Sequence, residues 1–254
     1  MNRTVKLSQG ICTERLNALD NPPPLWKSRL MEKRKETAKK TRSWKQDPEA
    51  VRADILRAAR AEFSKHGLSG ARVQEIADQI QTSKRMIFYY FGDKDGLYRA
   101  VLEEAYKSIR KAEAELDLDG LPPVDALSRL VELTFDHHRP NPDFIRLVMI
   151  ENIHGARHMQ SIETLTRTNT AAIEQIERIC DMGQKLGVFR KDISPLVIHW
   201  QISAMSFFNV SNQATFAINF GDAVFSEQAQ LDLREKVVKS ILASVVVEDV
   251  ETGQ

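Results

Sequence analysis

Apolar residues recur at helical spacing along most of the chain after residue 46. Val51, Ile55, Ala59 and Phe63 stand four residues apart, which is the period of one face of an amphipathic helix. No segment shows the sustained alternation and hairpin turns that paired strands would require. We therefore predict an all-α protein of about nine helices, with approximate bounds 47–67, 73–80, 84–91, 95–115, 124–138, 143–153, 159–181, 194–216 and 228–247.

Capping residues mark the starts of the first helices. Asp47 is a good N-cap, and Pro48 suits the first helical position because its missing N–H costs nothing there. Gly67 is expected to end the first helix with a positive φ, and Ser83 to cap the third. Helices of about 17, 8 and 7 residues followed by a longer one are typical of a helix-turn-helix domain with its connecting helix.

The charge is distributed unevenly along the sequence. Residues 1–46 hold 12 Lys and Arg against 4 Asp and Glu, residues 47–98 hold 8 of each, and residues 99–254 hold 16 against 23. A basic N-terminal part followed by an acidic remainder indicates that one end of the chain contacts a polyanion. A solubilising basic tail explains the charge alone equally well.

Composition excludes several classes of protein. No apolar run approaches the roughly 20 residues of a membrane span, and the N-terminus shows no secretory signal, so we expect a cytoplasmic protein without a membrane partner. Cys12 and Cys180 form no CxxC motif, and His154 and His158 lack a close set of further ligands, so no metal is predicted. No catalytic set or phosphate-binding loop supports an enzyme, and no catalytic residue or cofactor is predicted.

The segment Thr82-Ser83-Lys84-Arg85 carries the functional prediction. Ser83 would present the N-terminus of the third helix, with its unpaired N–H groups, to DNA phosphate. Lys84 and Arg85 are long donors that can reach guanine O6 and N7 in the major groove. Contacts to phosphates are expected outside this segment, from Arg72, Tyr89, Tyr90 and Lys94.

These residues also carry a family resemblance. The runs 55–63, 73–77, 83–84, 87–91 and 93–95, with Gly67 and Leu97-Tyr98, resemble the DNA-binding domain of the TetR family of bacterial transcriptional regulators. The resemblance implies that Lys84 and Arg85 approach bases and that Tyr89, Tyr90 and Lys94 approach phosphates. Within the family, Gly70-Ala71-Arg72 and the helices after Ser194 look like the branch that contains the pyrimidine-utilisation repressor.

Three positions depart from the family's usual pattern. Ala71 and Arg72 stand where two threonines are common, so a capping hydroxyl is missing and Arg72 would replace a phosphate contact by charge. Gln81 stands where the turn usually has glycine, and left-handed geometry at this position would cost about 1 kcal/mol. Met86 replaces a small residue or threonine, which puts that phosphate contact in doubt.

The resemblance further implies a homodimer that binds double-stranded operator DNA and a small-molecule effector. We expect a basic, mostly disordered extension over 1–46, a DNA-binding domain over 47–109, and a helical ligand-binding and dimerisation domain over 110–254. The last two long helices of this domain would pack against the same two helices of the second copy. Part of their apolar face would form this interface, and part would belong to the chain's own core. The helix after Ser194 mixes apolar and amide side chains, a composition that suits a ligand pocket and a dimer interface equally. The candidate ligand contacts are Phe144, Trp200, Phe208 and Asn212.

The function expected from the sequence is a repressor whose operator binding is relieved by a ligand. A ligand-dependent activator of the same fold is the alternative, and an all-helical enzyme or an adaptor that binds RNA or acidic protein are rivals of other classes. In a second hypothesis, Arg34, Lys35, Lys39, Lys40 and Arg42 lie along the duplex or in its minor groove. Met31 is an alternative start, which N-terminal mass spectrometry would decide.

Overall fold

The fold was obtained as a computed structural model that describes residues 47–247, with the backbone alone at 166–168. The predicted basic extension and its DNA-binding arm lie outside these residues. Within them the only β feature is an isolated bridge between Phe189 and Val246. The prediction of an all-α protein is confirmed by ten described helices: α2 (Pro48–Gly70), α3 (Val73–Gln79), α4 (Lys84–Phe91), α5 (Lys94–Ala114), α6 (Pro123–His138), α7 (Pro142–Ile153), α8 (Glu163–Lys185), α9 (Pro195–Ser211), α10 (Gln213–Phe220) and α11 (Glu227–Val245).

The capping residues expected from the sequence are confirmed. Asp47 Oδ1 accepts from the Ala50 N–H at 3.0 Å, with Pro48 in the first turn of α2. Ser194 caps α9 by accepting from the Val197 N–H. Gly67 has φ +65°, a conformation that costs glycine little, and it interrupts the helical geometry of α2 three residues before its end. The ends of these helices are therefore determined by short-range hydrogen bonds that can be read from the sequence.

The prediction of one helix over 194–216 is wrong. The structure has two helices there, α9 and α10, which are separated at Asn212. Ser211 and Asn212 hydrogen-bond to each other through their side chains, with Asn212 Nδ2 2.8 Å from Ser211 Oγ. Side chains of this kind compete with the helical backbone for hydrogen bonds, so a break at this pair is physically reasonable.

The start of the next long helix also differs from the prediction. Helix α8 begins at Glu163, and residues 159–161 form a short 3-10 helix, η1 (Met159–Ser161). Gly155 and Ala156 both have positive φ, and Ile162 leaves helical geometry with ψ 87°. These three departures interrupt α-helical geometry between α7 and α8.

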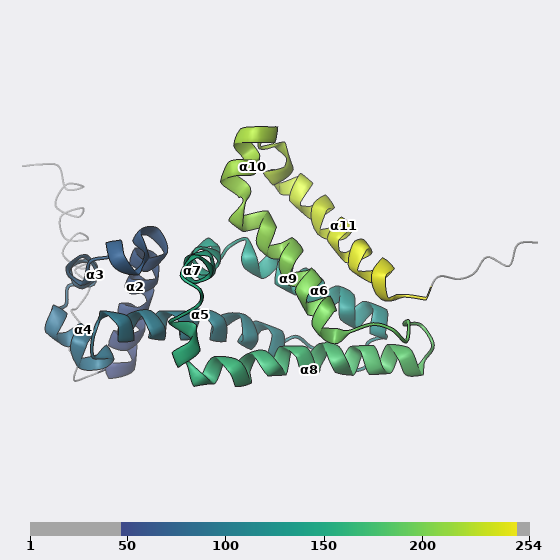
Figure 1. The fold of residues 1–254 in the computed structure, drawn as a ribbon, viewed down its shortest axis with the longest axis horizontal. Coiled ribbons are helices and arrows are strands. Elements are labelled where there is room, and N and C mark those ends of the chain that lie inside the picture. The colour runs from purple at the N-terminus through teal and green to yellow at the C-terminus, as the bar shows by residue number, and fades with distance from the viewer. Residues whose placement is uncertain (1–46, 248–254) are drawn as a thin grey trace, which may run out of the picture. The chain divides into compact units, whose positions relative to one another are not determined.

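Two apolar cores organise the helices. The first joins α2, α3, α4 and α5 to one side of α7, with Ile55, Phe63 and Leu147 fully buried. The second joins α6, α8, α9 and α11, with Phe135 and Ile241 at its centre. Figure 1 shows α2, α3 and α4 gathered around the first turns of α5, whose later turns run beside α8. Helix α5 thus belongs to both halves of the described chain.

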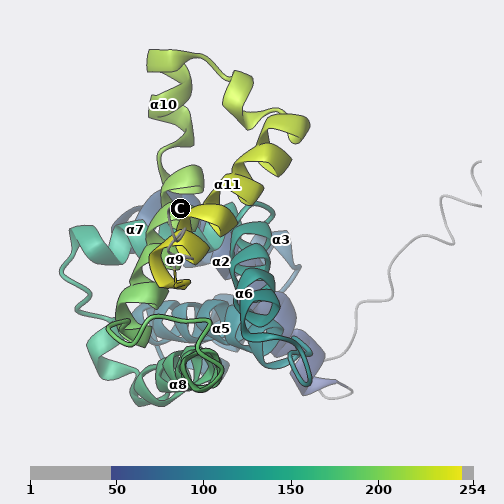
Figure 2. The ribbon, with the colours of Figure 1, turned by 90° about the vertical axis from the view of Figure 1, so that its right-hand side faces the viewer.

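Helices α9 and α11 form a hairpin with α10 at its far end (Figures 1 and 2). A second short 3-10 helix, η2 (Ala223–Phe225), leads from α10 into α11. The expected apolar face of α11 largely packs inward, since Val237, Ile241 and Val245 are buried in the chain's own core and Val238 and Leu242 are half-buried against it. In the described part of the chain, no helix has the length and apolar character that crossing a membrane requires.

Candidate functional site

The turn between α3 and α4 has the geometry of a helix-turn-helix motif. The Thr82 N–H donates to the Ala77 carbonyl at 2.9 Å, and Gln81 has φ +54°. This positive φ confirms the left-handed geometry expected where the family usually has glycine. Ser83 Oγ accepts from the Met86 N–H at 3.2 Å, which confirms Ser83 as the N-cap of α4.

Buried side chains beneath the turn decide which residues face outward. Ile76, Ala77 and Ile87 are fully buried and attach α3 and α4 to the rest of the first core. Lys84 and Arg85 are consequently exposed at the N-terminal end of α4, with Thr82 half-buried beside them. Two long cations at an open helix N-terminus form a surface of positive potential that suits DNA.

The residues expected to contact phosphates lie on either side of this surface. Arg72 and Tyr89 are exposed, and the Tyr89 ring packs edge-on against Tyr90 at 5.4 Å between centroids. Lys94 Nζ donates to the Ser69 carbonyl at 3.4 Å. The Tyr90 hydroxyl is buried without a hydrogen-bond partner in this structure, so a phosphate contact through it requires a side-chain movement.

At the start of α3, another side chain takes the place of the capping hydroxyl that is missing at Ala71. The sequence placed the missing capping hydroxyl at Ala71, whereas the N-cap of α3 is Arg72, whose side chain makes no capping hydrogen bond. The buried Glu62 of α2 accepts from the Arg72 N–H through Oε1 at 3.0 Å instead. A carboxylate at this position stabilises the start of α3 through the helix dipole as well as the hydrogen bond.

A second candidate site is a cavity of about 660 Å³ between α5, α6, α7, α8 and α9, here called the central cavity. Its walls are mostly apolar and aromatic, with Tyr106, Phe144, Trp200 and Phe207 among them. Polar and charged residues also line it, among them Arg110, Glu113, His138 and His199. Apolar walls with a few convergent polar groups are typical of a small-molecule site.

The four candidate ligand contacts from the sequence divide between two places. Phe144 and Trp200 line the central cavity, whereas Phe208 and Asn212 line a separate apolar hollow of about 570 Å³ between α9 and α11. The polar residues of the central cavity were not predicted as site residues. Arg110 and Glu113 could have been found, because they are charges that adjoin the apolar stripe of α5.

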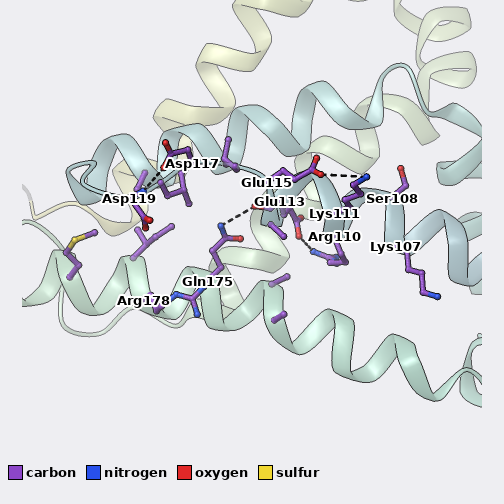
Figure 3. Close-up of a pocket in the computed structure, with 18 of the residues that line it drawn as sticks. Lys107, Ser108, Arg110, Lys111, Glu113, Glu115, Asp117, Asp119, Gln175 and Arg178 are labelled. Carbon is purple, nitrogen blue, oxygen red and sulfur yellow. Dashed lines mark hydrogen bonds and ion pairs between the residues drawn. The ribbon is translucent and has the colours of Figure 1, made fainter.

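A larger hollow, of about 1140 Å³, lies between the end of α5, the 115–119 loop and α8. Figure 3 shows that charged side chains line it and that several of them meet one another. Lys111 pairs with Glu115 at 3.7 Å, and Gln175 Nε2 donates to the Glu113 carbonyl at 3.4 Å. An open groove lined by charged side chains, several of which are already paired, is a weaker candidate for a ligand site than the central cavity.

Helix α7 connects the central cavity to the DNA-binding helices. Phe144, Val148 and Asn152, at intervals of four, line the cavity. On the side of α7 that meets α2, Asp143 Oδ1 accepts from Ser64 Oγ at 2.9 Å. A displacement of α7 by a ligand would therefore reach α2 directly.

A buried polar cluster joins the end of α7 to α5. Glu151 is only 1% exposed, and its Oε1 lies 2.8 Å from His158 Nδ1 while its Oε2 accepts from the His158 N–H at 3.2 Å. The His158 ring packs edge-on against Tyr98 of α5 at 5.1 Å, and its Nε2 lies 3.9 Å from Asp95. The Tyr98 hydroxyl is buried, and burial together with the nearby Glu151 carboxylate raises the pKa of Tyr98.

Comparison with known proteins places both halves of the chain in one family. Residues 55–101 match "Bacterial regulatory proteins, tetR family", and residues 123–241 match "Tetracyclin repressor-like, C-terminal domain". The chain is 34% identical over 187 residues to the HTH-type transcriptional repressor NicS of Pseudomonas putida, a match that covers 74% of this chain and 88% of NicS. It is 32% identical over 122 residues to the regulator RutR of Escherichia coli K12, covering 48% of this chain and 55% of RutR.

Solved structures show the same fold. A transcriptional regulator of Streptomyces coelicolor, SCO4942, superposes with a TM-score of 0.60 at 25% identity over 76% of this chain and 97% of its own. A tetR-family regulatory protein from Rhodococcus RHA1 superposes with a TM-score of 0.62 at 21% identity, over 78% of this chain and 98% of its own. The family expected from the sequence is thereby confirmed: the chain belongs to the TetR family of bacterial regulatory proteins and is a DNA-binding transcriptional regulator.

Proposed function

We propose that this regulator represses transcription by binding a two-fold symmetric operator as a homodimer in the cytoplasm, and that a small molecule in the central cavity weakens this binding. The observation that carries the proposal is the exposure of Lys84 and Arg85 at the capped N-terminus of α4. Repression is favoured over activation because NicS and SCO4008, both relatives, are named transcriptional repressors.

Base reading is assigned to Lys84 and Arg85, while Thr82 and Ser83 contact the adjoining phosphate. Arg72, Tyr89 and Lys94 would hold the flanking backbone, with Tyr90 added after rotation of its ring. Contacts to bases provide sequence recognition, and contacts to phosphates position the protein on the duplex. The domain boundaries expected at 46/47 and 109/110 stay predictions, and α5 crosses the second of them.

The first test is the selection of an operator from random double-stranded DNA by the full chain. The expected outcome is an inverted repeat whose half-sites are centred about 34–36 Å apart, or a multiple of that distance, because a symmetric dimer presents two α4 helices to successive major grooves. Enrichment of a single unrepeated site, or of no sequence, would contradict the proposal. Measuring affinity as a function of salt gives the number of phosphates neutralised.

Dimerisation is assigned to the exposed apolar residues of α9 and α11, including those that line the hollow between the two helices. Leu196, Val197, Met205 and Phe208 of α9 and Leu231 of α11 are exposed apolar residues, in contrast to the inward-packed residues of α11. An exposed apolar surface of this kind marks an interaction site. A second copy of the chain would cover it and form the four-helix arrangement expected from the sequence.

Replacing Phe208 with glutamate is expected to convert the dimer to a monomer at micromolar concentration. A carboxylate buried without a partner at the interface would cost several kcal/mol. Sedimentation equilibrium gives the association constant, and Ile153→Glu is the matched control because Ile153 is an exposed apolar residue of α7. If Phe208→Glu stays as dimeric as the control, the interface lies elsewhere.

Ligand relief follows from the position of α7 between the cavity and α2. If the ligand prefers the conformation with displaced α7 and DNA prefers the other one, each weakens the binding of the other. The factor by which the ligand lowers the affinity for DNA then equals the factor by which DNA lowers the affinity for the ligand. The cluster of Glu151, His158 and Tyr98 extends this connection to the first turns of α5. A ligand that strengthens operator binding would show the opposite polarity.

A further inference from the structure

A long uncharged stretch covers α9 and α10. Between residues 193 and 221 the sequence has no Lys, Arg, Asp or Glu, although these residues make up 28% of the chain. No other uncharged run in the sequence approaches this length. The core of a protein–protein interface is likewise depleted of charged residues and enriched in aromatic residues and Met. The composition therefore indicates a surface that another protein covers.

The segment 212–226, here called the arm, belongs to neither apolar core. It contains α10 and η2 and lies at the end of the hairpin of α9 and α11, away from the other described helices in both views (Figures 1 and 2). No residue of α10 is buried, and Ile218 and Phe220 are 85% and 75% exposed. Exposed apolar side chains gathered in this way mark an interaction site.

A cluster of phenylalanine rings joins the arm to α9. Phe216 lies edge-on to Phe208 of α9 at 6.5 Å and edge-on to Phe225 at 5.9 Å between centroids. The Phe220 ring lies 4.8 Å from that of Phe216. Phe208 is one of the residues to which dimerisation is assigned, so the apolar surface of the arm continues that interface.

Two buried amides fix the base of the arm. Asn209 of α9 donates through Nδ2 to Gln230 Oε1 of α11 at 2.8 Å, and Gln230 Nε2 donates back to Asn209 Oδ1 at 3.1 Å. Gln230 Nε2 also donates to the Val224 carbonyl of η2 at 2.9 Å. A buried polar network whose members are satisfied makes the surrounding structure rigid. The arm is therefore held in position before a partner binds, which lowers the entropy lost on association.

The apolar surface on α9 and α11 is small for a stable dimer. Its members are Leu196, Val197, Met205, Phe208 and Leu231. Stable interfaces contain about 20–30 residues from each partner. A dimer therefore needs more surface than these residues provide, and the arm is the exposed apolar surface that adjoins them through Phe208 and Phe216.

We propose that a second copy of the chain covers the outer face of α10, so that the arm extends the dimer interface beyond α9 and α11. The inference rests on the proposed function, in which the chain is a homodimer, and it adds a segment to that interface. In a two-fold dimer both copies use the same patch, so both arms are covered together. DNA and anionic membranes attract basic surfaces, and α10 has no charged residue.

Carboxylates on α10 test whether the arm takes part in dimerisation. Ile218→Glu and Phe220→Glu leave both cores unchanged. Each is expected to raise the dissociation constant of the dimer by about tenfold or more, because an unpaired carboxylate would be buried in the interface. Ile153→Glu changes a side chain of α7 that is 77% exposed, and it should leave the dissociation constant unchanged. Sedimentation equilibrium measures all three, and undiminished dimerisation of both α10 variants would overturn the proposal.

Cysteine labelling shows what covers the arm. The chain's own cysteines are Cys12, which is replaced with serine, and the buried Cys180. When nine-tenths of the chain is dimeric, Ile218→Cys is expected to react with a maleimide about tenfold more slowly than Ile153→Cys, because only the monomer reacts. Dilution to the monomer should make the two rates equal. Equal rates in the dimer would overturn the proposal, as would protection that persists in the monomer or that requires phosphatidylcholine vesicles.

Phe208→Glu separates this inference from the proposed function. If Phe208→Glu dissociates the dimer and the α10 variants remain dimeric, the interface on α9 and α11 is retained and the arm lies outside it. If the α10 variants dissociate and Phe208→Glu does not, the arm is retained and the assignment to α9 and α11 is wrong. Dissociation by all three variants supports one continuous interface, whereas a parent chain that is monomeric at micromolar concentration contradicts both proposals.

Discussion

Replacing Arg85 with alanine is expected to weaken binding to the selected operator by about 30-fold to 10⁴-fold. Each bidentate contact to guanine contributes about 1–3 kcal/mol of discrimination, and a symmetric dimer loses two of them. The side chain is exposed on α4 beyond the buried Ile87, so its removal leaves the fold intact. Fluorescence anisotropy at fixed salt measures the change.

Comparing the loss of affinity for operator DNA with that for unrelated DNA distinguishes a contact to bases from a contact to phosphates. Arg85→Ala should reduce affinity for the operator much more than affinity for unrelated DNA, whereas a phosphate contact such as Lys94 should affect both alike. Lys185→Ala, in the last turn of α8, removes an exposed cation far along the chain and serves as the control. An equal loss on both kinds of DNA would assign Arg85 to the backbone instead.

Replacing Glu151 with alanine is expected to lower the free energy of unfolding by about 2–6 kcal/mol, because it leaves two buried hydrogen-bond partners unsatisfied at about 1–3 kcal/mol each. The partners left behind are the His158 ring and the His158 N–H. Urea denaturation followed by circular dichroism measures the change. A loss of less than about 1 kcal/mol would show that water replaces the carboxylate.

The cluster of Glu151, His158 and Tyr98 also leads to a prediction about operator affinity, which a purely stabilising role of the cluster would not. Glu151→Gln keeps the volume and one acceptor, and it is expected to stay folded while changing operator affinity without any ligand. A double-mutant cycle with His158→Gln measures whether the two residues act as a unit, since contacting partners are non-additive. Additive effects on DNA binding would show that the cluster stabilises the fold and does not couple the sites.

Short-range chemistry explains why so much of the DNA-binding region was predictable. The caps at Asp47 and Ser83, the glycine at residue 67 and the apolar spacing of α2 act over three or four residues, so the printed sequence contains them completely. The positive φ of Gln81 was instead expected from the family resemblance, because the family usually has glycine at this position of the turn. The break at Asn212 was missed because the apolar pattern continues through it.

The ligand site was less accessible from the sequence. Phe144 and Trp200 line one cavity while Phe208 and Asn212 line another, although three of these residues lie on or next to α9. A helix presents different faces to different neighbours, and the pattern of α9, in which apolar and polar residues mix, does not say which face meets which helix. Arg110 and Glu113 pair locally, at i,i+3 spacing within α5, but the burial of this pair and of His138 depends on helices far apart in sequence.

The sequence by itself determined an all-α fold, the boundaries of most helices, and the exposed pair Lys84-Arg85 at a capped helix start, because each rests on local periodicity and capping. Only the tertiary structure decided where the central cavity lies, which charged residues are buried at its wall, and how α7 touches both the cavity and α2. These features arise from contacts between helices, where burial and charge depend on partners that no local pattern specifies. The helix-turn-helix could therefore be read along the chain, whereas the cavity required the fold.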